Sequence, residues 1–505
     1  MAQMSQAGDL TSGPMLKKII LFSLPLAASS FLQLLFNAAD VVVVGRFAGS
    51  AALAAVGSNG ALINLLVNLF VGLALGANVV AARCYGAKDD QGVHEAVQTA
   101  VTLSLVGGVL MAFVGFFAAH GLLELMSSPE DVIDLATLYL KIYFIGMPMT
   151  MLYNFNASLL RAVGDTRRPL VCLAVAGVIN VVLNLLFVIV FQMSVAGVAL
   201  ATILSQTVSA IMVTVLLVRE EGAMHLDLRH LGFHKKAMLQ IIQIGLPAGL
   251  QSTVFSLSNV VIQSAINSFG STVVAGNSAA SNLEGFIYTG MNAFAQAAVT
   301  FTSQNVGARR YDNLDRVMRN CLLCVTVVGL FLGCGAYFGG EVLLHFYSTD
   351  EAVVAAGLSR MQIICTAYFL CGIMDTLASC LRGRGYSVIP MIVSPGGQLP
   401  APSGLDRNHL PDVPLHRHAV HQLSHQLGPD RRGASHLSAG RAQKDERSAE
   451  GREPPGRITK NAFLCSAGER FVYSIFFNRY RSYPPYISRR SAMTKPQARA
   501  LFRLY

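Results

Sequence analysis

The sequence predicts an all-α, polytopic membrane protein made of two parallel-repeat helical bundles. Three observations predict this class: an apolar composition, a series of long apolar runs, and an internal repeat. Hydrophobic residues make up 53% of the 505 residues and charged residues only 13%, against roughly 25% charged residues in soluble domains. A chain this apolar lacks the polar surface that water requires, so the lipid bilayer is its expected solvent and partner.

Ten apolar runs reach the roughly 20 residues that a helix needs to cross a bilayer. They fall at 19–45, 52–81, 96–117, 135–159, 169–191, 194–218, 237–268, 273–303, 317–338 and 361–381. We expect six spans in an N-lobe (16–220) and four in a C-lobe (237–394), joined by a cytoplasmic linker (221–236). The N-terminal stretch 1–15 is polar, and the first apolar run is too long for a cleavable signal peptide, so we expect it to be retained.

Basic residues in alternate loops predict the orientation of these spans. One set of loops leans acidic, with Glu130, Asp131, Asp350 and Glu351. The other set carries Lys17, Lys18, Arg83, Lys88, Arg161, Arg167, Arg168, Arg219, Arg229, Lys235, Lys236, Arg309, Arg310, Arg316, Arg319, Arg382 and Arg384. By the positive-inside rule the basic loops and the N-terminus are cytoplasmic. This orientation is the one expected in a bacterial-type inner (plasma) membrane.

The two halves of the body share landmarks at an offset of about 221 residues. The matching segments are 23–27 with 245–249, 85–88 with 306–309, and 160–169 with 381–390. An even number of spans separates the copies, so the repeat is parallel, with its axis along the membrane normal. The first copy continues past Pro169 into two further spans. The second copy stops after Pro390, so the C-lobe lacks its last two expected helices.

The tail from 395 to 505 differs from the body in composition and charge. Residues 1–394 carry 20 Lys and Arg against 20 Asp and Glu, so the whole net charge of +10 belongs to the tail. We therefore expect no nucleic-acid partner for the body. We also expect the protein to be a monomer. The tail is rich in Pro, Gly, His and Arg, and it has three interpretations: a frame error, a disordered regulatory segment, or a metal-binding tract. The change falls inside an expected helix, which favours the frame error, and another reading frame around Ser394 is then expected to encode two spans.

Asp40 in the first span is the main candidate for a functional residue, because an ionisable side chain in a membrane is costly and tends to face a polar pathway. Asn37 lies three residues earlier on the same side of the helix. Asn180 and Asn184 share one face of the fifth span, and Thr202 lies in the sixth. Their oxygens together suit Na⁺, or a carboxyl that takes up a proton. The alternative is a structural role in hydrogen bonds between helices.

Glu284 in the eighth span and Asp375 in the tenth are candidates for the cleft or for a second coupling site, with a structural hydrogen bond as the alternative for each. Cys321 and Cys324 form a CxxC pattern with no second pair beside it, which favours plain core cysteines over a metal site. Four methionines are candidates for adaptable substrate contacts, or else ordinary core residues: Met147, Met149, Met151 and Met291.

Several short motifs together resemble the multidrug and toxic compound extrusion (MATE) family. They are Leu24-Pro25 through Asp40 and Gly45, Gly86-Ala87, Gln304-Asn305-Val306-Gly307-Ala308, and the paired Leu-Arg-x-x-Gly elements at 160–164 and 381–385. Each motif is weak alone, and the match covers roughly residues 15–394. The resemblance implies twelve helices in two lobes around a central cleft, with export driven by Na⁺ or H⁺ entry.

The resemblance also implies a cation site in the N-lobe. In the family, an acid of the first helix works with an Asn and an Asp of the fifth and a Thr of the sixth. The matching positions here are Asp40, Asn180, Asn184 and Thr202. Asn184 departs from the pattern, because the second carboxylate is missing. Asp375 is similar in location to an acid of the family's tenth helix.

These observations predict secondary active multidrug efflux, in which entry of H⁺ or Na⁺ drives antiport of amphipathic organic cations. No cofactor besides the coupling ion is expected. A lipid-linked saccharide flippase of the same superfamily is the nearest alternative, but it would favour a cationic cleft, and the spans hold almost no internal Arg or Lys. An intramembrane enzyme is not expected, because the sequence has no HExxH, GxSxG or DDxxD motif. A non-functional truncated product is the third alternative.

Overall fold

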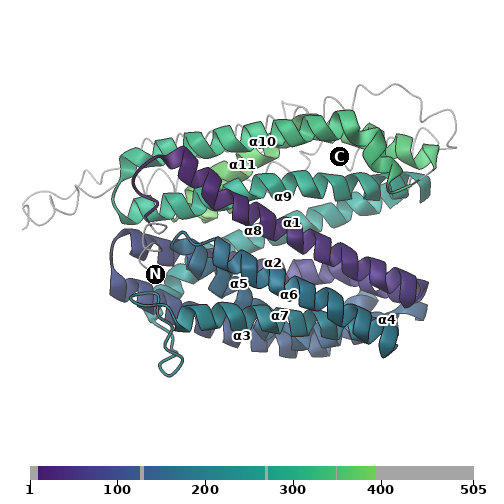
Figure 1. Cartoon of the computed structure of the whole chain (residues 1–505), viewed down its shortest axis with the longest axis horizontal. Helices are drawn as coiled ribbons and strands as arrows, with labels where there is room; N and C mark the ends of the chain where they lie inside the picture. The colour runs from purple at the N-terminus through teal and green to yellow at the C-terminus, as the bar shows by residue number, and fades with distance from the viewer. Residues whose placement is uncertain (1–8, 126–129, 268–270, 349, 393–505) are drawn as a thin grey trace, which may run out of the picture. The chain divides into compact units, whose positions relative to one another are not determined.

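A computed structural model of the chain describes residues 9–125, 130–267, 271–348 and 350–392, and the predicted tail (395–505) lies outside them. The described residues form helices joined by short connections (Figure 1). In chain order these are α1 (Met15–Phe47), α2 (Ser50–Gly86), α3 (Asp90–Leu125), α4 (Glu130–Ile145), α5 (Met147–Ala162), α6 (Arg167–Leu185), the π-helix η2 (Leu186–Val190), α7 (Ser194–Val218), α8 (Lys235–Asn267), α9 (Ser271–Gly307), α10 (Tyr311–His345) and α11 (Glu351–Gly383).

Each of the ten predicted spans coincides with one of these helices or with a bent pair. Within the described residues, six helices are long and apolar enough to cross a membrane, or up to eight if each bent pair is one span. The bent pairs are Val132–Ile145 with Met147–Ala162, at 50°, and Glu351–Gln362 with Ala367–Gly383, at 51°. The helices α8 and α9 are also long enough, at 33 and 37 residues, but their many Ser, Asn and Gln residues lower their hydropathy.

The helices form two bundles that lie side by side (Figure 1). The helices α2 to α7 pack together in the predicted N-lobe, and α9, α10 and α11 pack together in the predicted C-lobe. The helix α1 runs diagonally across both bundles and contacts α6 as well as α9, while α8 packs mainly against α2. The first helix of each repeat therefore lies at the boundary between the bundles.

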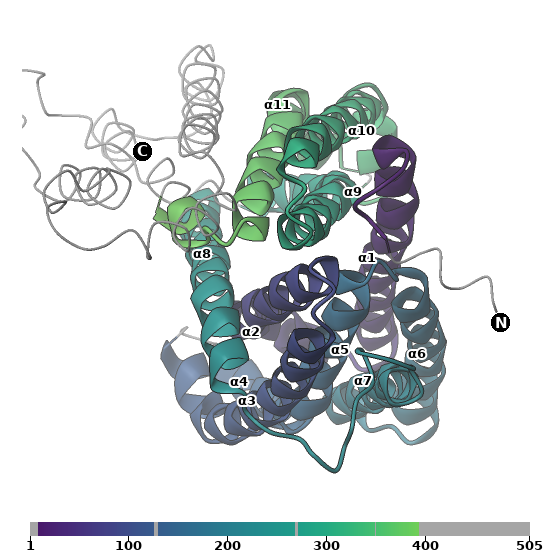
Figure 2. The same ribbon diagram turned by 90° about the vertical axis from the view of Figure 1, so that its left-hand side faces the viewer.

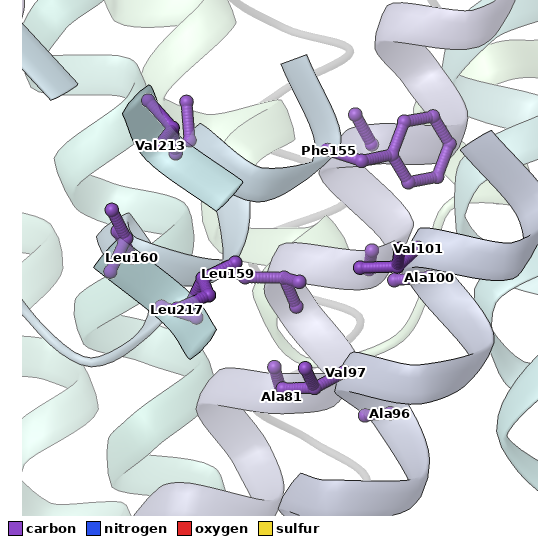
Figure 3. Close-up of a cluster of buried hydrophobic side chains, with 14 of the residues drawn as sticks. Ala81, Ala96, Val97, Ala100, Val101, Phe155, Leu159, Leu160, Val213 and Leu217 are labelled. Atoms are coloured by element: carbon purple, nitrogen blue, oxygen red, sulfur yellow. The ribbon is translucent and has the colours of Figure 1, made fainter. Parts of the chain in front are cut away.

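Small and branched apolar side chains fill the core of the N-terminal bundle (Figure 3). Ala81 of α2, Ala100 of α3, Phe155 and Leu160 of α5 and Val213 of α7 are all fully buried. Lipid tails are as apolar as these side chains, so burial from water does not hold the helices together within a bilayer. Their association depends on close van der Waals packing, which small residues permit.

Large aromatic side chains cover the outer faces of the helices. Phe117 of α3 is 70% exposed, and Phe331 and Phe338 of α10 are 77% and 83% exposed. Soluble monomers rarely expose extensive apolar surface of this kind. Apolar helices with apolar outer faces define a multi-pass membrane protein, as the composition predicts.

The internal repeat extends to unusual backbone conformations. Gly164 and Gly385, which follow α5 and α11 and lie 221 residues apart, have φ of +95° and +91°. Lys88 and Arg309, with the same separation, have φ of +57° and +56°. A left-handed residue after a helix is a common way to stop it. The same stop at the same offset in both halves confirms the parallel repeat.

Two glycines on α2 meet two glycines on α8 where the bundles join. A Cβ on Gly76 would lie only 2.9 Å from the Gly245 nitrogen, and one on Gly72 would overlap the backbone of Gly249. Spacing of four residues places both glycines of each helix on one face, as in other close crossings of membrane helices. Any larger side chain at these positions would push α8 away from α2.

Candidate cation site

The helix α1 approaches α6 closely enough to bring Asp40 to the end of the fifth predicted span. The Phe36 ring of α1 fills the space beside Gly177 of α6, where a Cβ would overlap the ring. Asp40 lies four residues after Phe36, on the same side of α1. The close crossing at Gly177 therefore carries the carboxyl of Asp40 to the last turn of α6.

Four of the predicted site residues meet around this carboxyl. The amide Nδ2 of Asn184 donates a hydrogen bond to Asp40 Oδ1 and lies 3.3 Å from Asn180 Oδ1, to which it also donates. The hydroxyl of Thr202, on α7, lies within hydrogen-bonding range of the Asp40 carboxyl and donates to the Val198 carbonyl at 2.9 Å. Asn180 and Asn184 are buried. Helices α1, α6 and α7 thus each contribute to one polar cluster.

One oxygen of this cluster lacks a hydrogen-bond donor. Asn184 Oδ1 is buried, and the described part of the chain offers it no partner. A buried acceptor without a donor is costly. The Asp40 carboxylate, the Asn180 oxygen and the Thr202 hydroxyl are further oxygens of the kind that hard cations bind. The donor set fits Na⁺, and the single carboxylate fits H⁺.

A π-helical turn follows the two asparagines. The helix α6 ends at Leu185 and continues as η2 (Leu186–Val190), in which the Phe191 nitrogen donates to the Leu186 carbonyl at 3.1 Å. Such single π-turns within α-helices occur often at functional sites, because they shift the register of the side chains on either side. Here the shift lies directly beside Asn184.

The structure departs from the sequence analysis at two positions near Asp40. Asn37, predicted to share the face of Asp40, is exposed and lies outside the cluster. Tyr139 of α4, which the sequence analysis did not single out, is buried and lies near the Asp40 carboxyl. Its ring stacks on Tyr143, with centroids 6.2 Å apart. A hydroxyl-bearing aromatic residue within an apolar run was the only sequence signal for Tyr139.

Glu284 is not a lone acid. Its Oε1 accepts from Arg360 Nε at 2.8 Å, and its Oε2 accepts from Arg360 Nη2 at 2.7 Å. Arg360 also donates through Nη1 to Asn277 Oδ1. The pair joins α9 to α11 inside the C-terminal bundle, and the Glu284 side chain is only 7% exposed. This two-point ion pair neutralises the charge of Glu284 within the span.

Asp375 lies on α11 in a different environment. The hydroxyl of Tyr288, on α9, donates a hydrogen bond to its carboxyl, and Arg382 lies near enough to interact with its charge. Arg382 donates to Gln251 Oε1 of α8 at 2.7 Å. Neither Asp375 nor Glu284 takes part in the cluster around Asp40, so the structure brings the N-lobe residues together and leaves the two C-lobe acids outside that cluster, each with its own partners.

The other candidate residues lie mainly in the cores of the bundles. Met147 and Met151 are buried in the N-terminal bundle and Met291 in the C-terminal bundle, with exposures of 1% or less, while Met149 is partly buried. These three buried methionines are core residues, the second of the two alternatives that the sequence left open. Cys321 and Cys324 are buried and free on α10. No group of three or more potential metal ligands occurs in the described ranges.

The fold and the site define the class of protein: a multi-pass membrane protein of two repeat-related helical bundles, with a polar cluster around a carboxyl inside one of them. A sequence model of the MatE family matches residues 25–186 and 247–398. The chain belongs to this family, and family membership makes it a membrane transporter and not an enzyme. The matched region ends close to Pro395, where the composition changes.

Curated relatives and solved structures agree with this assignment. The chain is 30% identical over 380 residues to the probable multidrug resistance protein YpnP of Bacillus subtilis, covering 75% of this chain and 85% of YpnP. It is 27% identical over 385 residues to the probable multidrug resistance protein YoeA of the same organism, covering 75% and 83%. An outward-facing multidrug resistance MATE transporter of the MOP superfamily shares the fold, with a TM-score of 0.74 at 19% identity over 94% of this chain and 97% of that one.

Proposed function

We propose that this transporter exports amphipathic organic cations by antiport with H⁺ or Na⁺, and that Asp40 is the coupling carboxyl. The observation that carries the proposal is the position of Asp40 in a span, with the Asn184 amide and the Thr202 hydroxyl beside its carboxyl and Asn180 joined to them through Asn184. A carboxylate inside a bilayer is costly unless it binds a proton or a cation or lines a polar path. The names of the relatives YpnP and YoeA support a multidrug substrate range.

Binding at Asp40 would act through the helices that meet there. The cluster joins α1, which contacts both bundles, to α6 and α7 of the N-terminal bundle. A cation bound between these helices favours the packing in which the oxygen ligands from all of them can reach it. The ion shifts the balance between the two access states only by the difference in its affinity for them. The basic ends of the helices, and with them the N-terminus, face the cytoplasm in this proposal.

Substitution of Asp40→Asn tests the proposal. The amide keeps the size of the side chain and loses the charge that binds and releases the cation. We expect Asp40→Asn to abolish drug resistance in a strain without other exporters, at unchanged expression. The matched control is Asp134→Asn on α4, because Asp134 is exposed, and it is expected to keep resistance. Full resistance in the Asp40→Asn strain, with ion-driven substrate flux intact in vesicles, would remove Asp40 from the mechanism.

A further inference from the structure

The ends of α2 and α9 touch through one glycine each, at the end of the molecule where the basic loops lie (Figure 2). A Cβ on Gly86 would overlap the Gln304 carbonyl oxygen, and a Cβ on Gly307 would overlap the Arg83 carbonyl oxygen. Gly86 and Gly307 lie 221 residues apart, and so do Arg83 and Gln304. The contact is therefore symmetric about the axis that relates the repeats, and the two backbones leave no space between them.

The side chains of Arg83 and Gln304 extend this contact across the two bundles. Gln304 Nε2, from α9, donates to the Ala162 carbonyl at 2.7 Å, and Arg83 Nη2, from α2, donates to the Gly383 carbonyl at 3.4 Å. Ala162 and Gly383 are the last residues of α5 and α11, again 221 apart. The final carbonyls of a helix have no partner within it. Each bundle thus supplies a donor to a helix end of the other.

The N-terminal segment, residues 9–12, binds at this same junction between the bundles. Leu10 is 3% exposed, its nitrogen donates to Gln304 Oε1 at 3.1 Å, and its carbonyl accepts from Asn305 Nδ2 at 3.2 Å. The Thr11 carbonyl accepts from Arg310 Nη1 at 2.9 Å and from Asn313 Nδ2 at 2.8 Å. The amide of Gln304 is therefore shared: its oxygen holds the N-terminal segment, and its nitrogen holds the opposite bundle.

Asp9 fixes the shape of this segment. Its carboxylate accepts hydrogen bonds from the Thr11 nitrogen at 2.8 Å, the Thr11 hydroxyl at 2.6 Å and the Ser12 hydroxyl. Burial by itself raises the pKa of Asp9, but the hydrogen bonds from Ser12 and Thr11 outweigh it and lower the pKa to about 2. The segment is thus held in a turn by an ionised carboxylate near neutral pH.

Like charges oppose this closure. Lys88 and Arg309, which are repeat-related, line one hollow of about 430 Å³ together with Arg310, Gly86 and Gly307. Three cationic side chains around one hollow repel one another, and salt weakens that repulsion. The hydrogen bonds that hold the bundles together here therefore act against the repulsion between Lys88 of one bundle and Arg309 and Arg310 of the other.

We propose that Arg83 and Gln304 are positioning residues of a gate that closes the basic end of the transporter, and that Leu10 stabilises the closed gate by binding the Gln304 amide. The inference rests on the proposed function, since alternating access requires this end to open and close. Opening breaks the two repeat-related hydrogen bonds between the bundles. Once the bundles separate, the Gln304 amide can no longer bind the Leu10 nitrogen and the Ala162 carbonyl at the same time. Release of the N-terminal segment therefore accompanies opening.

The gate is tested by measuring its width directly. Spin labels at Asp90 of α3 and Asp312 of α10, both exposed, report the distance between the bundles at the basic end by pulsed electron paramagnetic resonance. The labels go into the full chain with its nine native cysteines replaced, checked for retained folding. Loss of one interbundle hydrogen bond is expected to raise the open fraction about two- to tenfold. We expect this for Gln304→Ala and for Arg83→Gln.

Matched controls are available for each substitution. Gln243→Ala on α8 and Arg319→Gln on α10 change the same residue types at exposed positions, and they are expected to leave the distances unchanged. For the N-terminal segment, Leu10→Ala keeps the backbone N–H that donates to Gln304 and removes the buried side chain that anchors the segment. This variant is expected to raise the open fraction, whereas Leu16→Ala, at a position 39% exposed, is not. Gln304→Glu keeps the acceptor for Leu10 and loses the donor to Ala162, so it serves if Gln304→Ala fails to fold.

The outcomes separate this inference from the proposed function. Wild-type distance distributions in the folded Gln304 and Arg83 variants would refute the proposed gate. A Leu10→Ala variant with the same distances as Leu16→Ala would refute the role of the N-terminal segment in stabilising the closed state. The distances require no transport, so they remain readable if Asp40→Asn shows that the coupling proposal is wrong. Conversely, export that depends on Asp40 together with unchanged distances would leave the function standing and remove the gate.

Discussion

Removal of one partner from the ion pair between Glu284 and Arg360 is expected to destabilise the C-terminal bundle. Both oxygens of Glu284 are held by Arg360, at 2.8 and 2.7 Å, and the side chains are 7% and 25% exposed. Breaking a buried ion pair by removing one partner costs about 3–5 kcal/mol, because the other charge is left unpaired. The partial exposure of Arg360 lets water reach its charge, so we expect Glu284→Gln to cost about 3 kcal/mol.

Thermal unfolding in detergent measures this cost. The chain has no tryptophan, but Cys321, Cys365 and Cys380 are buried thiols that a thiol-reactive dye detects as they become exposed. Glu284→Gln is expected to lower the melting midpoint by several degrees. The double variant Glu284→Gln with Arg360→Gln removes both charges and keeps a donor for Asn277, so it is expected to regain most of the stability. A wild-type midpoint for Glu284→Gln alone would refute the reasoning.

The same double variant separates a structural from a coupling role for Glu284. A stable double variant that still exports substrate identifies the pair as a structural link between α9 and α11. A stable double variant without export assigns the pair to transport, as a part of the cleft or a second coupling site, which the sequence analysis gives as one alternative for Glu284. The stability measurement removes the ambiguity of a transporter that fails only because it unfolds.

Two further predictions concern the basic end and the glycines. Gly307→Ala is expected to lower the melting midpoint, because its Cβ would overlap the Arg83 carbonyl. The matched control is Gly335→Ala, in open space on α10, which is expected to raise stability by up to about 1 kcal/mol through helix propensity. Equal effects of the two substitutions would contradict the close contact at Gly307. For Asp9, a folded pKa of about 2 below the usual 3.8 means that its stabilisation of the N-terminal turn is full above about pH 4 and is lost as the pH falls towards 2. Hydrogen exchange of Leu10 and Thr11, corrected for its intrinsic pH dependence, should therefore be constant from pH 8 to about 5; a change in that range would exclude Asp9 as the cause.

Local patterns in the sequence determined the spans, the repeat and the main site residue. Apolar runs locate the helices, because a segment in lipid must satisfy its backbone hydrogen bonds internally and needs no distant partner to do so. Gly164 and Gly385 mark the helix stops of both repeats, since only a local φ is required of them. Asp40 stood out because one charge within a long apolar run is costly wherever its partners lie.

Only the tertiary structure decided which side chains meet. Whether an acid is alone depends on the neighbouring helices: Glu284 is paired by Arg360, 76 residues away, whereas Asp40 is met by amides and hydroxyls. The sequence could not reveal Tyr139 near Asp40 or the proposed gate at Gln304, because both depend on contacts between helices. Asn37 lies on the predicted side of its helix but does not reach the cluster. Contacts between helices depend on the angle and depth of each crossing, which glycines such as Gly177 and Gly307 set through the packing of two chain segments at once.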